Sequence, residues 1–417
     1  MKIMRIIAAV LLLGVFVSAV RAQEWTRFRG PNGSGLGVAP GLPVKWTDAD
    51  YQWKVELPGG GPSSPVVWGD RVFLTCTDEA TSERSIVCIN AADGSIIWKK
   101  AFPYKFYKIN PNNGFASATP AVDEERVYVS WSEPESYMLA AFDHNGKEAW
   151  KLDLGPYASQ HGSGTSPIVV GDLVVLSNEQ DGPHSFLVGV EKKTGQIRWK
   201  LDRRSGKTPA STPCVYHPKG GSEQIIFTST LEGIVAVDAS SGNVAWAMPE
   251  AFNLRCVASP VVAGDMVIAQ CGEGAAGRYT LAVRAGSESQ KPEVVYKLNK
   301  MVPYVPSPLV KGDLLFLWSD TGVVSCMRLS SGQVLWQQKL GASAKESGAY
   351  FGSPVCVNDK LYCISKTGDV VVVAATEKYE LLARNPLGEP SFATPAVAGG
   401  KMYLRTTRHL FCLSSKG

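Results

Sequence analysis

The sequence predicts an all-β fold, an eight-bladed β-propeller made of four-stranded antiparallel blades. Two periodic features of the 417-residue chain support this prediction. A Ser or Thr followed by Pro and a short apolar run recurs eight times, and a Gly-x-x-x-Trp segment recurs five times in one phase of that repeat. A fixed period of about 40–50 residues with several short strands per unit is typical of propellers.

The hydroxyl–proline motif marks the start of each repeat. Its prolines are 55, 47, 46, 47, 48, 46 and 41 residues apart, which is too regular for chance. The eight copies are Ser64-Pro65, Thr119-Pro120, Ser166-Pro167, Thr212-Pro213, Ser259-Pro260, Ser307-Pro308, Ser353-Pro354 and Thr394-Pro395.

The residues after each proline predict four short strands, and the apolar run that follows the proline is the first of them. A short apolar run leads to a two-residue turn such as Gly69-Asp70 or Gly264-Asp265, whose residues accept the positive φ of a tight hairpin. An alternating strand follows, as at residues 71–74, and then a third strand, as at residues 234–237. A Gly-bearing turn then leads to the fourth strand.

The fourth strand usually carries a tryptophan. The Gly/Trp pairs are Gly94/Trp98, Gly146/Trp150, Gly195/Trp199, Gly242/Trp246 and Gly332/Trp336. The fifth repeat has Tyr296 at this position, and the seventh, near residues 380–382, lacks an aromatic residue. A large ring at one fixed position of every blade predicts packing between adjacent blades.

The eighth repeat stops after its third strand, residues 410–413. Residues 51–55 precede the first motif and place Trp53 in the setting of the other tryptophans. We therefore predict that this N-terminal strand completes the last blade, because closing the ring removes its open edges. The predicted propeller spans residues 51–417, after a lead-in segment at residues 23–50.

Residues 1–22 have the pattern of a secretory signal peptide. Lys2 and Arg5 precede an apolar stretch at residues 6–17. Val20-Arg21-Ala22 is a small-residue cleavage site, and Val17-Ser18-Ala19 is a second candidate. An uncleaved N-terminal anchor is the alternative. No Cys stands directly after the apolar stretch, where a lipid would be attached, and no later apolar run is long enough to span a bilayer. We therefore expect a periplasmic or secreted chain without a lipid anchor.

Composition and cysteine spacing exclude several classes of function. The net charge is +4 without a long run of one sign, which argues against a nucleic-acid binder. The nine cysteines are odd in number and form no Cys-x-x-Cys motif, so neither a zinc site nor a redox motif is predicted. Most lie in apolar runs, where a free thiol behaves as a small hydrophobic group. The five histidines show no metal-ligand spacing, and we predict no metal site.

Residues 238–246 (DASSGNVAW) resemble the tryptophan-docking repeat of the pyrroloquinoline quinone (PQQ) family. The resemblance covers nearly all of residues 50–417 and implies an eight-bladed quinoprotein-type propeller. That family includes PQQ-dependent alcohol and sugar dehydrogenases, and also BamB-like exported scaffolds that have the same repeats and no cofactor. Residues 25–33 (WTRFRGPNG) are similar to the lead-in of secreted bacterial members.

The resemblance also implies what a dehydrogenase of the family needs. Such enzymes have two adjacent cysteines over the cofactor and, in some cases, a Cys-x-x-Cys-His haem motif, and this sequence has neither. We therefore expect no catalytic residues and no cofactor. The leading interpretation is an exported, non-catalytic scaffold or binding protein whose partner is an envelope protein or an extracellular polymer. The alternatives are a PQQ- and calcium-dependent alcohol or sugar dehydrogenase and a carbohydrate-binding accessory protein.

The repeat phase also predicts which residues face the axis at one end of the ring. In a propeller, the loops between second and third strands share a face with the connections that enter each first strand. One hypothesis is that this face forms a polar pocket or docking surface, and the alternative is a rim that contacts only solvent. The predicted residues are Asp78, Asn113, Glu133, His161, Glu179, Arg255, Glu273, Tyr304, Asp320 and Tyr350.

The connection at residues 102–115 is unusually long and accounts for the 55-residue spacing. Tyr104, Phe106 and Tyr107 are interleaved with lysines in it. The sequence supports two interpretations equally: a recognition loop for a peptide or glycan, or a loop whose rings pack over the first two blades.

Overall fold

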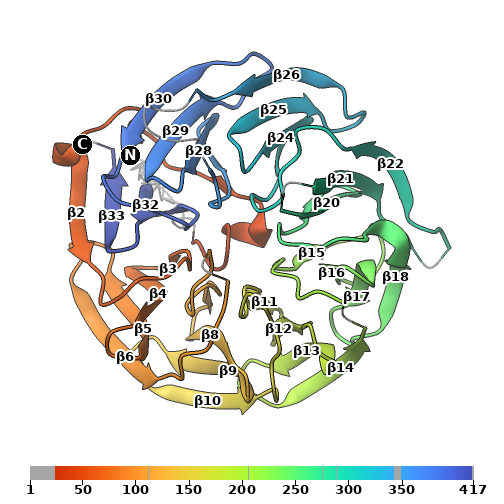
Figure 1. Cartoon of the computed structure of the whole chain (residues 1–417), viewed down its shortest axis with the longest axis horizontal. Helices are drawn as coiled ribbons and strands as arrows, with labels where there is room; N and C mark the ends of the chain where they lie inside the picture. The colour runs from red at the N-terminus through yellow and green to blue at the C-terminus, as the bar shows by residue number, and fades with distance from the viewer. Residues whose placement is uncertain are drawn as a thin grey trace, which may run out of the picture.

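The computed structural model describes residues 24–110, 112–204, 206–274, 276–287, 289–341 and 349–415. The predicted signal peptide lies outside the described residues. The sheets form a closed ring of eight blades around a central axis (Figure 1). The predicted fold class is confirmed.

Blades one to four each consist of four consecutive strands. Blade one contains β3 (Val66–Trp68), β4 (Arg71–Asp78), β5 (Glu83–Asn90) and β6 (Ile96–Pro103). Blade two contains β7 (Ala121–Val122), β8 (Arg126–Glu133), β9 (Ser136–Asp143) and β10 (Glu148–Asp153). Blade three contains β11 (Ile168–Val170), β12 (Leu173–Asn178), β13 (Ser185–Glu191) and β14 (Ile197–Arg203). Blade four contains β15 (Cys214–Tyr216), β16 (Gln224–Ser229), β17 (Gly233–Asp238) and β18 (Val244–Met248).

Blades five to eight follow the same order, and the last two recruit N-terminal strands. Blade five contains β19 (Val261–Ala263), β20 (Met266–Glu273), β21 (Ala276–Arg284) and β22 (Glu293–Leu298). Blade six contains β23 (Leu309–Lys311), β24 (Leu314–Trp318), β25 (Val323–Arg328) and β26 (Val334–Lys339). Blade seven contains β27 (Val355–Val357), β28 (Lys360–Ile364), β29 (Asp369–Ala374), β30 (Leu381–Pro386) and the added β1 (Leu36–Gly37). Blade eight contains β31 (Ala396–Ala398), β32 (Lys401–Arg405), β33 (His409–Ser414) and β2 (Tyr51–Glu56).

The N-terminal strand β2 closes the ring as predicted. It pairs antiparallel with β33, with Trp53 opposite Cys412 and Glu56 opposite His409. Figure 1 shows the orange-red β2 beside the blue β33 at the outer edge of blade eight. Chain segments from opposite ends of the sequence therefore complete one blade.

The hydroxyl of each Ser/Thr-Pro motif joins one blade to the previous one. The backbone N–H of each motif Ser or Thr donates to the side-chain oxygen of the corresponding residue in the next blade, at 2.9–3.2 Å. The last bond, from Thr394 N–H to Ser64 Oγ, returns to the first blade. All eight residues are buried, so each hydroxyl satisfies a backbone donor that water does not reach. The ring contains Ser64, Thr119, Ser166, Thr212, Ser259, Ser307, Ser353 and Thr394.

The fourth-strand aromatic residues join neighbouring blades near the outer rim. The indole N–H of Trp199 on β14 donates to Ala239 O of blade four at 3.0 Å, and its ring lies against Gly242. A Cβ at Gly242 would lie 2.7 Å from this ring, and its φ of 75° also favours glycine. The glycine of each Gly-x-x-x-Trp segment thus receives the ring of the preceding blade. Equivalent bonds to the next blade come from Trp53, Trp98, Trp150, Tyr296 and Trp336.

Trp246 is an exception among the predicted docking residues. Its ring packs in a cluster shared by blades four and five, but its N–H donates to Gln224 Oε1 of its own blade at 2.9 Å. The connection between β21 and β22 spans residues 285–292, which is longer than the five residues between β5 and β6. Blade five therefore lacks the short turn that accepts the indole in other blades.

The lead-in segment supplies the aromatic residue that blade seven lacks. Ala383 occupies the fourth-strand position opposite Val372, and Trp46 packs beside it against Tyr362 with ring centroids 6.5 Å apart. Trp46 N–H donates to Asn385 Oδ1 at 3.0 Å. The lead-in is therefore part of the propeller rather than a separate segment.

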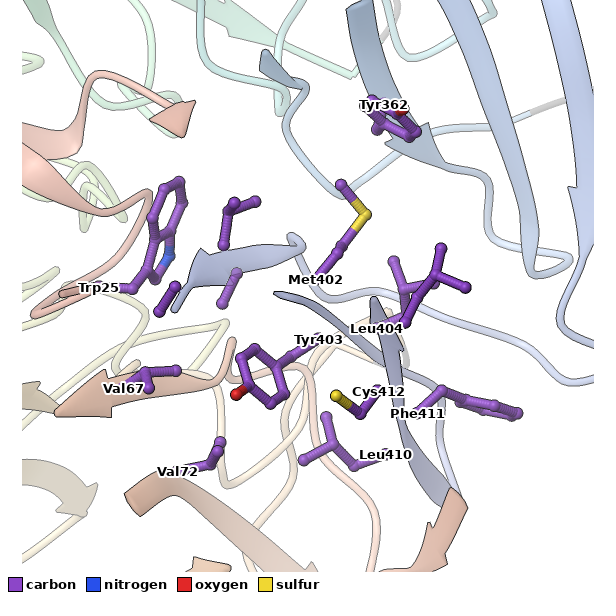
Figure 2. Packing of buried hydrophobic residues seen from close by; sticks show 14 of the residues in the cluster. Trp25, Val67, Val72, Tyr362, Met402, Tyr403, Leu404, Leu410, Phe411 and Cys412 are labelled. Atoms are coloured by element: carbon purple, nitrogen blue, oxygen red, sulfur yellow. The ribbon is translucent and has the colours of Figure 1, made fainter. Parts of the chain in front are cut away.

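The hydrophobic core lies between the blades as a series of interblade clusters. The largest joins the lead-in to blades one, seven and eight. Figure 2 shows Tyr403, Leu410 and Cys412 of blade eight facing Val72 of blade one, with Trp25 beside Val67. All nine cysteines are buried and unpaired, as hydrophobic packing predicts. Within the described ranges, no helix is long and apolar enough to cross a bilayer.

The hydroxyl ring makes Ser259 a test of blade-to-blade closure. Ser259→Ala removes the acceptor of Thr212 N–H and leaves a buried donor unsatisfied, so we expect a loss of about 1–3 kcal/mol in the free energy of unfolding. Ser259→Thr keeps the hydroxyl and is the matched control. Guanidinium denaturation followed by tryptophan fluorescence measures both. Equal stabilities of the two variants would contradict this role.

The role of Trp46 is tested by Trp46→Ala. Removing a buried indole from between the lead-in and blade seven should lower the free energy of unfolding by about 3–5 kcal/mol. Trp46→Phe retains an aromatic ring and should lose less. Thermal unfolding followed by circular dichroism compares the two, and an unchanged Tm for Trp46→Ala would show that blade seven does not depend on this ring.

Candidate functional site

The lead-in segment closes one end of the central channel. Its residues bond to the inner strands of four blades, and the orange-red chain reaches the centre of the ring in Figure 1. Phe28 lines a central cavity of about 150 Å³ together with the eight motif hydroxyl residues. The axis is therefore open toward the other face, which we call the mouth.

Buried arginines hold this segment in place. The guanidinium of Arg27 donates to Pro213 O of blade four, and that of Arg29 donates to Pro354 O of blade seven at 3.2 Å. Asn32 exchanges two hydrogen bonds with the backbone of Val215 on β15, at 2.7 and 2.8 Å. Burial lowers the pKa of Arg29 to about 9 and that of Arg27 to about 10, so both remain charged at neutral pH.

A recess of about 410 Å³ opens at the mouth. Loops after second strands and connections into first strands build it, as the repeat phase predicts. Six of the ten predicted face residues line it: Asn113, His161, Arg255, Glu273, Tyr304 and Asp320. Val257, Val305 and Phe351 add an apolar wall.

The two carboxylates that line the recess are held in ion pairs. Glu273 pairs with Lys207 at 2.5 Å, and this pairing lowers the pKa of Glu273. Asp320 pairs with Arg278 at 3.1 Å and also accepts hydrogen bonds from the backbone N–H groups of Tyr304 and Val305. These carboxylates are therefore neutralised by neighbouring donors.

His161 and Arg255 also line the recess, but neither side chain forms an ion pair within the described residues. His161 Nδ1 lies 2.9 Å from Asn113 Oδ1 and donates to it. Burial, followed by the charge of Arg255, lowers the pKa of His161, so the ring is neutral at neutral pH. Arg255 is 8 % exposed, and its Nε has no acceptor among the described residues.

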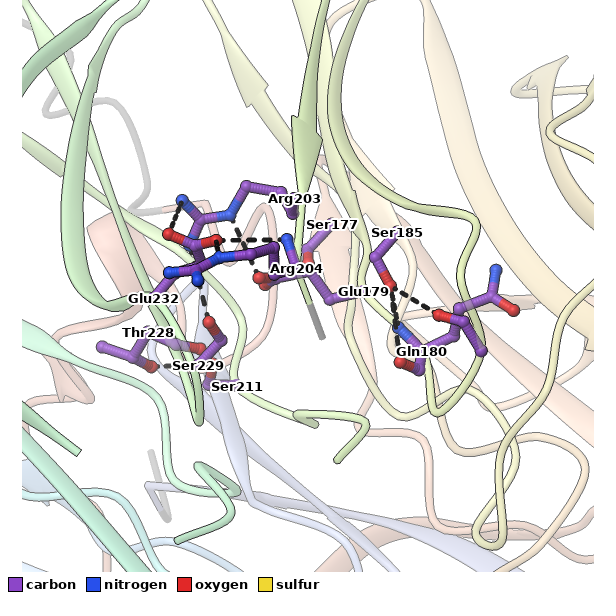
Figure 3. Close-up of polar contacts among 11 residues, drawn as sticks. Ser177, Glu179, Gln180, Ser185, Arg203, Arg204, Ser211, Thr228, Ser229 and Glu232 are labelled. Atoms are coloured by element: carbon purple, nitrogen blue, oxygen red, sulfur yellow. Dashed lines mark hydrogen bonds and ion pairs between the residues drawn. The ribbon is translucent and has the colours of Figure 1, made fainter. Parts of the chain in front are cut away.

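The remaining predicted face residues lie outside this recess. Glu179 is 2 % exposed and accepts from Arg203 Nε at 3.1 Å within a network that includes Ser177 and Glu232 (Figure 3). Tyr350 is also buried, with its ring against Trp318. These two side chains are structural, which corrects their assignment to an accessible face.

Glu133 and Asp78 also do not line this recess. Glu133 pairs with the buried Arg84 at 3.5 Å. Asp78 accepts from Ala80 N–H at 3.0 Å and borders a neighbouring recess of about 420 Å³, which shares Asn112 and Asn113 with the first. These two predicted carboxylates are therefore engaged in an ion pair and a turn contact.

The aromatic connection mainly packs on the propeller. Tyr104 is 6 % exposed, and Arg84 lies over its ring. Tyr107 donates to Ser132 O at 3.2 Å, and both rings contact Phe115. Phe106 is 67 % exposed, so it is the one residue of the predicted recognition loop with a largely accessible ring.

The sequence did not identify several residues that decide the character of the recess. Lys207 and Arg278 neutralise its carboxylates, and Asn110, Gln160 and Phe351 line it. Arg278 lies on β21, outside the loop positions used for the prediction, and Lys207 lies in a connection with no repeat signal. Only their distances in the folded chain identify them.

The residues of the mouth do not fit a calcium-bound quinone. Calcium needs several oxygen ligands that converge. In the described part of the chain, no group of three His, Cys, Asp or Glu side chains is placed to hold a metal ion. The two acidic residues that line the recess are instead engaged by Lys207 and Arg278.

Comparison with known families decides the family of the chain. The family model described as outer membrane protein assembly factor BamB matches residues 44–289, 180–341 and 216–417. This chain belongs to the BamB family. A curated relative, the outer membrane protein assembly factor BamB of Moranella endobia (strain PCIT), is 23% identical over 320 residues, covering 72% of this BamB-family chain and 65% of the relative. The match thus spans slightly under two thirds of that relative's length.

Solved structures share the fold of this BamB-family chain. BamB from Moraxella catarrhalis has a TM-score of 0.60 at 14% identity, covering 87% of this chain and 96% of that one. Quinohemoprotein alcohol dehydrogenase from Comamonas testosteroni has a TM-score of 0.63 at 13% identity, covering 95% and 81%. Because a BamB protein and an alcohol dehydrogenase share this fold, the fold alone does not decide function, which must come from the site.

The structural role of Glu179 is tested through its partner. Arg203→Met leaves the buried Glu179 charge uncompensated and should lower the free energy of unfolding by about 3–5 kcal/mol. Arg204→Met is the control, because Arg204 is exposed and its ion pair should contribute about 1 kcal/mol or less. Urea denaturation compares the variants. Equal effects at the two positions would contradict the assignment.

Proposed function

We propose that this BamB-family chain is an exported, non-catalytic scaffold that binds a protein partner through its mouth. The observation that carries this proposal is the recess of about 410 Å³, whose size is typical of binding pockets. Its carboxylates are held in ion pairs with Lys207 and Arg278. Such a site favours binding over general acid–base chemistry, which needs a titratable group directed at a substrate.

Three exposed apolar side chains lie on elements of the mouth face. Phe106 and Met301 lie in connections that enter first strands, and Leu231 lies in the loop between β16 and β17. These elements belong to the mouth, and exposed apolar side chains on the same face as a polar pocket suit a protein–protein contact. The propeller is thus proposed to present a preformed surface to its partner.

The relative from Moranella endobia is named as an outer membrane protein assembly factor. We propose by this likeness that the partner belongs to the outer-membrane protein assembly machinery. The basic and apolar pattern of residues 1–22 supports a periplasmic location. A carbohydrate-binding role has less support, because Tyr104 is buried and Tyr107 is engaged with Ser132. We likewise propose that the chain works without PQQ or calcium.

Site-specific photo-crosslinking tests the proposed surface. A photoreactive phenylalanine placed at Phe106, Leu231 or Met301 should crosslink the purified outer-membrane assembly complex of the same cells. The control position is Val334, which is exposed at the outer edge of β26. We expect products from the mouth positions and not from Val334, because the partner docks at the mouth.

Two results would contradict the proposal. Equal crosslinking from Val334 and the mouth positions would show that the contact is not specific to this face. Reduction of a redox dye on addition of PQQ, calcium and an alcohol would indicate the dehydrogenase alternative.

A further inference from the structure

Arg255 stands apart from the other buried arginines of the described chain. Six arginine side chains are buried, and five of them donate at least one hydrogen bond. Those five are Arg27, Arg29, Arg84, Arg203 and Arg405. The guanidinium of Arg255 makes no hydrogen bond and no ion pair within the described ranges. Its Nε is buried without an acceptor, as are those of four of the other five, so the difference is that neither Nη atom of Arg255 has a partner.

The backbone holds Arg255 at the wall of the mouth recess. Its carbonyl accepts from Gly272 N–H at 3.0 Å, which ties the connection from blade four to β20 of blade five. Arg255 lines the recess beside Tyr304 and Val257. The side chain is therefore fixed near a cavity rather than projecting into bulk water.

The neighbouring carboxylates are engaged elsewhere. Asp181 accepts from Gln160 N–H at 2.9 Å and from the N–H and hydroxyl of Thr208 at 2.6 and 2.9 Å. Glu273 is paired with Lys207. Among the charged side chains that line the recess, Arg255 is thus the one cation left without a partner in the described structure.

Only the Nε of Arg255 is fully buried without an acceptor, so this cation is partly desolvated, and it is less favourable in the empty protein than a paired cation. A guanidinium offers five N–H donors in a planar fork that matches a carboxylate with two parallel hydrogen bonds. Arg278 also lines the recess but is paired with Asp320, so Arg255 offers one unpaired guanidinium beside an apolar wall. One unpaired guanidinium suits one carboxylate better than a phosphate group, whose recognition uses clusters of arginine. The geometry therefore favours a ligand with one carboxylate and a short apolar part.

We propose that the mouth recess binds a carboxylate-bearing peptide segment of the partner, with the carboxylate on Arg255. The inference rests on the proposed scaffold function and adds the chemistry that the site recognises. Tyr304, Val257 and Phe351 supply the apolar wall for the flanking side chain. The carboxylate comes either from a C-terminus or from an Asp or Glu side chain of the segment.

Isothermal titration of the full mature chain with short peptides tests the inference. The probes are acetyl-Ala-Leu-Ala with a free C-terminus, the same peptide as its amide, acetyl-Ala-Glu-Ala-amide and sodium acetate. We expect one or both carboxylate peptides to bind and the neutral amide not to bind. Which carboxylate peptide binds identifies the source of the carboxylate. Binding of the amide, or acetate binding as tight as that of the peptides, would overturn the inference.

Substitutions then assign the binding to Arg255. Arg255→Met should weaken peptide binding by about tenfold or more, since charge-assisted hydrogen bonds are lost. Arg255→Lys should retain part of the affinity, and Arg204→Met, at an exposed position outside the recess, should leave it unchanged. Equal affinity in Arg255→Met and the unaltered protein would overturn the assignment.

Stability gives a second readout that does not depend on the ligand. Because the guanidinium of Arg255 has no partner among the described residues, Arg255→Met should raise the Tm of the protein without ligand. A lower Tm would show that Arg255 has a structural role, and this would overturn the inference.

The crosslinking and peptide experiments together separate this inference from the proposed scaffold function. If neither the unaltered protein nor Arg255→Met binds the peptides, but both still crosslink to the assembly complex, the carboxylate site is rejected and the scaffold function stands. If no mouth position crosslinks to the assembly complex in the protein that retains Arg255, the scaffold function itself is rejected.

Discussion

The closed ring of eight hydroxyl-to-backbone hydrogen bonds is the constraint on which the rest of this propeller depends. Each motif Ser or Thr both donates its backbone N–H and accepts at its side-chain oxygen, so every blade is tied to two neighbours. Because the residues are buried, an unmade bond would leave a desolvated N–H. The ring fixes the spacing of the blades around the central channel, and it therefore fixes where each first strand begins.

The fourth-strand aromatic residues also connect each blade to the next one, at a position farther from the axis. Gly242 lets the ring of Trp199 approach closely enough to donate to Ala239 O, and four other turns repeat the arrangement. Blade seven shows that the interblade space must be filled, though not by its own strand. Trp46 enters from the lead-in beside Ala383, so a segment outside the repeats becomes part of the core.

The mouth combines a rigid frame with one uncompensated charge. Lys207 and Arg278 form ion pairs with the carboxylates, and the lead-in segment around Phe28 closes the far end of the central channel. Arg255 is held against this frame without an acceptor among the described residues. A local loss of stability at a prearranged site is common where a protein binds a ligand, because the missing interaction is completed by that ligand.

The sequence alone determined the number of blades, their strand order and the closing strand, because the Ser/Thr-Pro and Gly-x-x-x-Trp patterns act between neighbouring repeats of fixed length. Repeat phase also placed Asn113, His161, Arg255, Glu273, Tyr304 and Asp320 on one face, where they line one recess. Only the tertiary structure decided that Glu179 and Tyr350 turn inward, that Trp46 replaces a missing tryptophan and that Arg255 lacks a partner. Each of these depends on contacts between residues far apart in the chain, and periodicity carries no information about which side chains meet across blades.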